Sequence, residues 1–323
     1  MIYTALVFLS IAIFFLLIPG MGAYAVRQRW RIFRGRVMKS LALPVYHPGR
    51  SMIAADQALE CRFYGILEAV EDNDRLWVRD NQSSVAVEVH RSQVFMTPVG
   101  SEVDWDSLYV DSMRSLRWER SGVLPEGLGV FVAGTVRLKG GLPSFGGEPG
   151  EDPLVIFFDG DPATVLTRAI WFGRQRNEYW NDVSPISLLT GFVALLALAL
   201  FGFRDEASLY VAVFSAAFSL LPFLPLLPPG IIGFFLYRRL WRQGRTLRAR
   251  RDLFLLRQAV NQLEPEGIAP IANLPGQRPG PTGHATKARV RILELGGLGV
   301  LGVGILVNLY IVLRLIIQLM NNT

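Results

Sequence analysis

The chain has 323 residues, 51% of them apolar, and a formal net charge of +6. Only three of its 33 basic residues are lysines, and the densest arginine runs adjoin long apolar stretches, a placement typical of membrane orientation signals rather than of nucleic-acid binding. The single cysteine, Cys61, excludes an internal disulfide bond, and three dispersed histidines lack metal-ligand spacing. We expect no metal, no cofactor and no nucleic-acid partner.

Four apolar stretches divide the chain, and each can supply the roughly 20 residues that cross about 30 Å of hydrocarbon. They cover residues 2–25, 186–203, 209–237 and 295–313. The expected fold class is an α+β membrane protein, with four transmembrane helices and a small OB-like β-barrel between the first two. The expected segments are an anchor at 1–26, a β-rich domain at 27–160, a juxtamembrane helix at 161–183, two spans at 184–237, a basic amphipathic helix at 238–263, a flexible Pro/Gly-rich loop at 264–291 and a glycine-rich span at 292–320.

Arginine placement predicts the orientation of these segments. Arginines follow the first stretch at 27–36, and seven more, without an acidic residue, occupy 238–251. Because cytoplasmic loops carry the excess of basic residues, we expect 26–183 and 238–291 on the inner side of a cell inner membrane. The segment 204–208 and the C-terminus then lie outside.

The soluble segment is typical of a β domain. Alternation of Val85, Val87 and Val89 predicts a strand at 84–90. Further strands are predicted at 61–70, 76–79, 128–138 and 153–158, with a glycine-rich loop at 140–152. Short strands with glycine between them favour a small barrel.

A helix is predicted to follow the last strand. Asp161 is a suitable N-cap and Pro162 fits the first helical position; Ser184 and Pro185 repeat this pattern at the second span. Between them lies an aromatic and basic group that can act as an interfacial anchor or bind a partner. Its members are Trp171, Arg174, Arg176, Asn177, Tyr179 and Trp180.

The third stretch contains Pro222, Pro225, Pro228 and Pro229. Proline removes an amide donor and kinks a helix, so we expect one span broken near its cytoplasmic half and packed against the other spans. A structural kink and a substrate-lining element both remain open.

The basic segment that follows is predicted to bind lipid headgroups or a partner. Leu240, Leu247 and Phe254 recur at seven-residue spacing and mark an apolar stripe. The predicted binding residues are Arg238, Arg239, Arg242, Arg245, Arg248, Arg250 and Arg251. Orientation alone also explains this charge.

The last span predicts a helix-packing face. Gly297, Gly304 and Asn308 share one face by their spacing of seven and four residues. Small residues let helix backbones approach, and a membrane asparagine seeks a hydrogen-bond partner. We expect membrane lipids as partners, together with a protein partner or homo-oligomerisation through the spans.

The segments 35–40 (GRVMKS), 127–138 (GLGVFVAGTVRL) and 153–170 (PLVIFFDGDPATVLTRAI) resemble the membrane-embedded mitochondrial ubiquitin ligase family. The resemblance covers residues 35–176 and implies a β-rich domain between two spans. It does not imply ligase activity, because that family's zinc-binding RING needs many cysteines.

Three functions follow from these patterns. The first is a non-catalytic membrane scaffold or regulatory subunit that presents the β domain to cytoplasmic partners. The second is a transporter or channel component, favoured by the broken third span and disfavoured by the lack of charge inside the spans. The third is a membrane-bound enzyme acting on lipid, for which Glu178 and Asp182 are the acidic candidates near the interface.

Overall fold

The computed structural model describes residues 2–48, 58–71, 74–80, 83–90, 92–99, 111–118, 125, 127–146, 152–179, 181–204, 209–263 and 284–322. The chain forms two compact units. One, the helical unit, comprises residues 1–30, 177–247 and 283–323. The other, the barrel unit, comprises residues 31–176 and 248–282.

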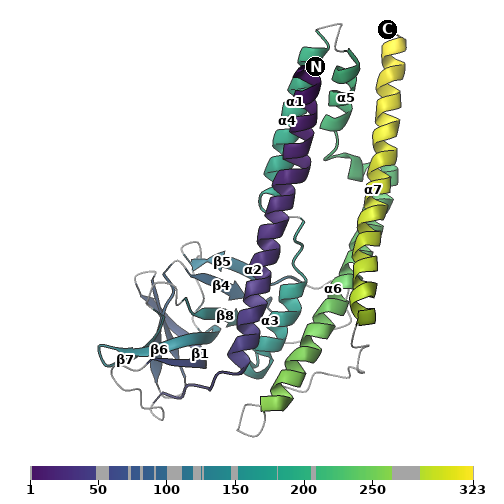
Figure 1. Cartoon of the computed structure of the whole chain (residues 1–323). Helices are drawn as coiled ribbons and strands as arrows, with labels where there is room; N and C mark the ends of the chain where they lie inside the picture. The colour runs from purple at the N-terminus through teal and green to yellow at the C-terminus, as the bar shows by residue number, and fades with distance from the viewer. Residues whose placement is uncertain are drawn as a thin grey trace. The chain divides into compact units, whose positions relative to one another are not determined.

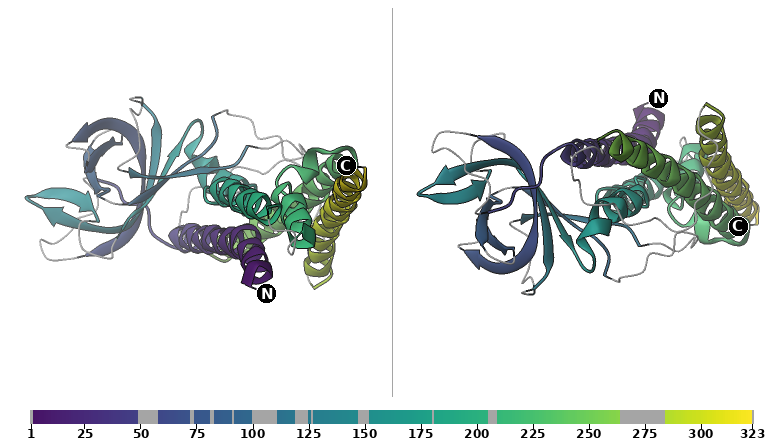
Figure 2. Two further views of the ribbon diagram at one scale, coloured as in Figure 1. Left: turned by 90° about the horizontal axis from the view of Figure 1, so that it is seen from above. Right: turned by 90° about the horizontal axis from the view of Figure 1, so that it is seen from below.

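The barrel unit contains a closed five-stranded β-barrel (Figure 1). Its strands are β1 (Leu59–Glu71), β2 (Arg75–Arg79), β3 (Ser84–Glu88), β7 (Leu142–Phe145) and β6 (Gly129–Lys139), paired in that order. The long strand β1 pairs with both β2 and β6, which closes the barrel. Only β3 and β7 pair in parallel among these neighbours. Figure 2 shows these strands curving around a common centre.

Apolar side chains fill the barrel interior. Alternate residues of β1, such as Cys61 and Phe63, point inward with Val85 and Val87 of β3 and Phe145 of β7. Burial of β-branched and aromatic side chains on one face of each strand holds the register, because a shift by one residue would turn every one of them outward.

The sheet continues beyond the barrel from β6. The first half of β6 pairs with β8 (Leu154–Phe158), which pairs in parallel with β4 (Gln93–Met96). β4 in turn pairs with β5 (Arg114–Arg117). Every residue of β8 is buried, which explains its continuous apolar sequence.

A short helical segment follows β8. It consists of η3 (Pro162–Thr164) and α3 (Val165–Arg174), whose ten residues are all buried. The Asp161 carboxylate accepts a hydrogen bond from the Ala163 amide at 2.9 Å, so the predicted helix start is confirmed.

The five predicted strands are present, but the sequence patterns missed β4, β5 and β7. β7 lies in the segment predicted as a loop at 140–152. Gly140 and Gly141 adopt φ angles of 58° and 83°, so they form a tight turn that returns the chain along β6. Each missed strand has only four residues, too few for a clear alternation.

The helical unit contains most of the apolar stretches. In chain order its elements are α1 (Ile2–Ile11), the π-helical η1 (Ala12–Leu17), the first part of α2 (Ile18–Leu41), α4 (Ser184–Gly202), α5 (Leu209–Ser219), η5 (Leu224–Leu226), the first part of α6 (Pro228–Leu263) and α7 (His284–Asn321). Three described helical segments are long and apolar enough to cross a membrane: Ile2–Leu41, Ser184–Gly202 and Lys287–Asn321. This is a membrane protein by that criterion.

The expected third span is divided into two helices. α5 has 11 residues, and the chain then breaks through η5 before α6 begins at Pro228. The break lies at the middle of 209–237, where the four prolines begin, because these prolines fall between residues 222 and 229.

Three predicted boundaries are wrong. α2 continues to Leu41, so residues 27–41 are helical rather than part of a β segment. The juxtamembrane helix predicted at 161–183 ends earlier, with α3 at Arg174, and α7 begins at His284 rather than after 291. Arginine and leucine are good helix formers, so α2 and α7 remain helical where their sequences become polar. Residues 264–283 of the predicted flexible loop lie outside the described part.

Helices of this unit are joined by close backbone contacts. The Ser187 hydroxyl donates to the Phe14 carbonyl at 2.6 Å, and the Ser215 hydroxyl donates to the Leu195 carbonyl at 2.8 Å. Figure 1 shows α4 beside α5. Small and hydroxyl-bearing residues are the usual means by which membrane helices pack.

Candidate functional site

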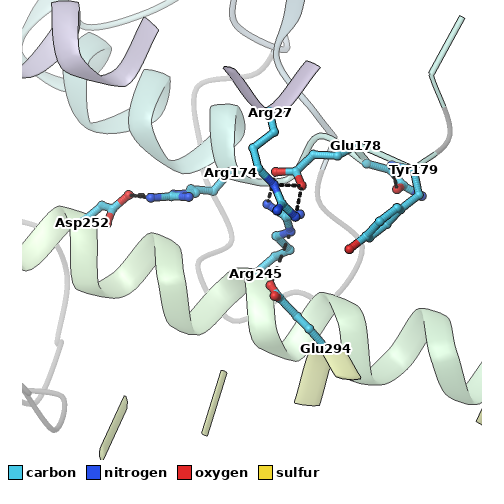
Figure 3. Close-up of polar contacts among 8 residues, drawn as sticks. Arg27, Arg174, Glu178, Tyr179, Arg245, Asp252 and Glu294 are labelled. Atoms are coloured by element: carbon cyan, nitrogen blue, oxygen red, sulfur yellow. Dashed lines mark hydrogen bonds and ion pairs between the residues drawn. The ribbon is translucent and has the colours of Figure 1, made fainter. Parts of the chain in front are cut away.

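Four charged side chains of the helical unit form an ion-pair cluster, shown in Figure 3. Arg27 of α2 donates from Nε to Glu178 Oε2 at 2.9 Å, and Arg245 of α6 donates from Nη1 to Glu178 Oε1 at 2.9 Å. Glu294 of α7 places Oε1 3.9 Å from Arg245 Nε. The cluster therefore joins three helices to the segment that precedes α4.

The turn that carries Glu178 is fixed by its own polar side chains. The Asn181 side-chain oxygen accepts from the amides of Val183 and Ser184 at 3.1 and 3.2 Å. Asn181 therefore fixes the turn that precedes α4. The helix begins at Ser184 with Pro185 in its first turn, and the N-cap position is Val183 rather than Ser184. The Cα of Gly22 lies so close to Asn181 that a Cβ there would approach its side-chain oxygen to 2.5 Å.

Burial makes the Glu178 pairing strong. The side chains of Glu178 and Arg245 are only 5% and 3% exposed. Burial by itself raises the pKa of the Glu178 carboxyl, but hydrogen bonds and charge from Arg245 and Arg27 outweigh it and hold that pKa below its usual value. The Arg245 guanidinium also lies over the Trp241 ring, 4.8 Å from its centroid. The geometry keeps Glu178 ionised and held in place.

The barrel unit contains a second buried pair. Arg174, the last residue of α3, donates to Asp252 Oδ2 from Nε at 2.6 Å. Its Nη2 lies 2.5 Å from the same oxygen, and Arg251 contacts the other carboxylate oxygen at 3.2 Å. This pair attaches the end of α3 to the second part of α6.

Two members of the predicted interfacial group do not lie where an interfacial anchor would. Trp171 is fully buried within the barrel unit and Arg174 is paired with Asp252, so neither side chain is available to lipid headgroups. Arg176 and Asn177 are half-buried, and Tyr179 is exposed. Trp180 lies outside the described residues. Burial depends on which elements cover α3, which the local sequence does not encode.

The predicted headgroup-binding arginines of α6 also separate by exposure. Arg238 and Arg239 are exposed. Arg245 is buried in the ion-pair cluster, so the prediction that it binds headgroups or a partner is wrong. The remaining members are half-buried: Arg242, Arg248, Arg250 and Arg251. Sequence reasoning missed the cluster, although Glu178 and Glu294 are isolated acids beside arginine runs, which is a signal for such pairing.

The predicted packing residues of α7 lie against α6 and the break before it. A Cβ on Gly297 would lie 3.4 Å from the Tyr237 carbonyl oxygen, and one on Gly304 would lie 3.2 Å from the Pro229 carbonyl oxygen. Asn308 donates from Nδ2 to the carbonyl oxygens of Leu224 at 2.6 Å and Leu227 at 3.4 Å. These residues contact segments of the same chain.

Among the residues that the structure describes, no three His, Cys, Asp or Glu side chains converge as a metal site would require. His90 contacts Asp74 at 2.8 Å on the surface. The buried Cys61 thiol has its pKa raised to about 12 by burial, which suppresses the reactive thiolate.

No family model, characterised protein or solved structure matches this chain. The function must therefore be argued from the geometry itself.

Proposed function

We propose that the chain is a non-catalytic integral membrane scaffold or regulatory subunit that presents the barrel unit to cytoplasmic protein partners. One observation carries the proposal: Glu178 and Asp252, both buried, are each held by arginines at hydrogen-bond distance. Buried pairs of this kind fix segments in place, and loss of one partner is strongly destabilising. A general acid needs a raised pKa, whereas that of Glu178 is lowered.

The barrel unit offers a surface that supports this role. An open groove of about 950 Å³ has both apolar and charged side chains in its lining: Tyr64, Ile66, Leu128 and Phe158 with Arg79, Asp80 and Asp159. Ile66 is exposed and pairs with the exposed Arg79, so its side chain lies on the outer face of β1. Apolar side chains in and beside a groove favour contact with a partner protein.

We infer that the barrel is OB-like, because its strands follow a Greek-key order with a parallel contact between β3 and β7. This layout is the part of the ubiquitin ligase resemblance that we retain as a proposal. We also infer a fourth span formed by α5, η5 and the start of α6. The arginines at 27–36 and 238–251 then place the barrel unit on the cytoplasmic side of an inner membrane.

A transporter or channel component is the second candidate. It is favoured by the helix break at 220–227 and by buried Asn308 beside it, since broken helices often line transport sites. The third candidate, a lipid-acting enzyme, would need Glu178 or Asp182 to exchange a proton, and the ion pairs of Glu178 oppose that role.

Purification of the tagged full chain from its native membrane in mild detergent tests the scaffold. We expect a stoichiometric protein partner that is lost in an Ile66→Asp variant. The exposed Val99→Asp substitution in the same unit is the matched control and keeps the partner. A chain that migrates alone in all three preparations, or as a homo-oligomer without another protein, contradicts the scaffold; cation or substrate flux in liposomes would support the transporter instead.

Orientation is tested separately with Leu142→Cys, an exposed position on β7. We expect an impermeant maleimide to label this cysteine only after the inner membrane is permeabilised. Labelling in intact spheroplasts would place the barrel outside and remove the cytoplasmic role.

A further inference from the structure

Exposed side chains of the helical unit change from apolar to arginine along three of its helices. On α6 the exposed residues Phe234 and Phe235 precede exposed Arg238 and Arg239. α2 shows the same order, with exposed Met21 and Tyr24 before exposed Arg29.

On α7 the order is reversed along the chain. Arg289 and Arg291 are exposed, and they precede Ile292 and Leu295, which are 70% and 67% exposed. A helix that runs the opposite way through the same boundary would show this reversal.

Contacts within the unit place these changes near the same height. α6 and α7 are antiparallel, because Gly297 faces Tyr237, and a Cβ on Gly244 would lie 3.2 Å from Glu294 Cγ. Tyr237, next to the change on α6, faces Gly297, which lies five residues from Ile292, so the two changes are about 8 Å apart along the helix axes. The ion-pair cluster links Arg27 of α2 to Glu294 of α7 through Glu178 and Arg245.

The exposed arginines at this level have no carboxylate partner among the residues that the structure describes. We call the set of Arg29, Arg238, Arg239, Arg289 and Arg291 the arginine collar. Within the described part of the chain none of the five makes a side-chain hydrogen bond or ion pair, unlike Arg27 and Arg245. Their guanidinium groups are therefore available to pair with an anion from outside the chain.

We propose that the arginine collar binds the phosphates of anionic phospholipids in the leaflet that surrounds this end of the helical unit. The adjoining exposed Phe, Ile and Leu side chains fit the hydrocarbon layer. An anionic ligand at this position is therefore a lipid headgroup rather than an acidic protein or a nucleic acid. A guanidinium group matches a phosphate with two parallel hydrogen bonds. The proposal rests on the membrane placement under Proposed function and extends it, because Arg29, Arg289 and Arg291 were not among the predicted residues.

The purified full chain, reconstituted without any partner protein, tests the collar. The probes are spin-labelled phosphatidylglycerol and phosphatidylcholine in phosphatidylcholine bilayers, and the measurement is the relative association constant of each lipid at the protein surface. Each arginine near a membrane surface contributes about fivefold to the affinity for an anionic lipid. We expect wild type to prefer phosphatidylglycerol, and Arg238→Gln/Arg239→Gln to lower that preference at least about fivefold.

The matched control is Arg114→Gln/Arg117→Gln, which removes the same charge from exposed positions on β5 and leaves the preference unchanged. Protection of the Cys61 thiol verifies folding of each variant. Equal association constants for the two lipids in wild type, or equal losses in the two variants, overturn the proposal. Because no partner protein is present, failure here leaves the scaffold proposal standing, and failure to find a partner leaves the lipid result standing.

Discussion

Asn308 is expected to replace a backbone donor that the proline-rich break removes. In an uninterrupted helix the Leu224 carbonyl would accept from the amide of residue 228, but Pro228 has no N–H. Asn308 Nδ2 donates to that carbonyl at 2.6 Å, and its side chain is 1% exposed. An Asn308→Leu substitution removes the donor and keeps the branched arrangement of side-chain heavy atoms.

The expected cost can be worked out from these contacts. The second contact, to Leu227 at 3.4 Å, is weak because that carbonyl already accepts from the Ile231 amide at 2.8 Å. One interhelical hydrogen bond between membrane helices contributes about 0.6 kcal/mol on average and about 1.7 kcal/mol at most. The Leu224 carbonyl keeps only a bond from the Leu227 amide at 3.3 Å. We therefore expect Asn308→Leu to lower the free energy of unfolding by about 0.6–1.7 kcal/mol.

The assay is reversible unfolding of the full chain in mixed detergent micelles, followed by circular dichroism. A Pro228→Ala background supplies an amide at the position that lacks one, so Asn308→Leu should cost less there. A variant as stable as wild type would refute the argument, as would an equal cost in both backgrounds.

Three further predictions concern other parts of the chain. At pH 8, Cys61 should react with a thiol reagent about 1,000-fold more slowly in the native chain than in denaturant. Its pKa of about 12 lowers the thiolate fraction, and burial also restricts access of the reagent. Similar rates in the two states would refute the buried position. Glu178 has a lowered pKa, so its contribution to stability is present above the carboxyl's unfolded pKa near 4.5 and is lost as the pH falls through the folded value. The decrease in the free energy of unfolding at acidic pH should therefore be smaller in Glu178→Gln than in wild type. An equal decrease in the two proteins would contradict the lowered pKa. Gly230→Ala should destabilise the helical unit by about 1–3 kcal/mol, because the added methyl group would clash with the Leu224 carbonyl and with Asn308. In the same unfolding assay the control Gly296→Ala should change stability by less than about 0.5 kcal/mol, because open space surrounds Gly296.

Local sequence patterns determined the elements whose physics is local. The apolar stretches predicted three helices long enough to span a membrane, because length and composition alone satisfy that condition. Alternation predicted β3, and short apolar runs between turn residues predicted β1, β2, β6 and β8. Asp161 with Pro162 predicted the start of the helical segment after β8. The spacing of Gly297, Gly304 and Asn308 identified residues that share a helix face.

Tertiary structure alone decided which charges are buried and which are exposed. Arg245 and Arg239 look alike in the same basic run, yet one is buried against Glu178 and the other faces outward. The difference depends on Glu178, 67 residues away in sequence, and on α7 lying against α6. Trp171 likewise became a core residue through the elements that cover α3. An ion pair between distant segments depends on the packing of whole helices, and no local sequence pattern encodes that packing.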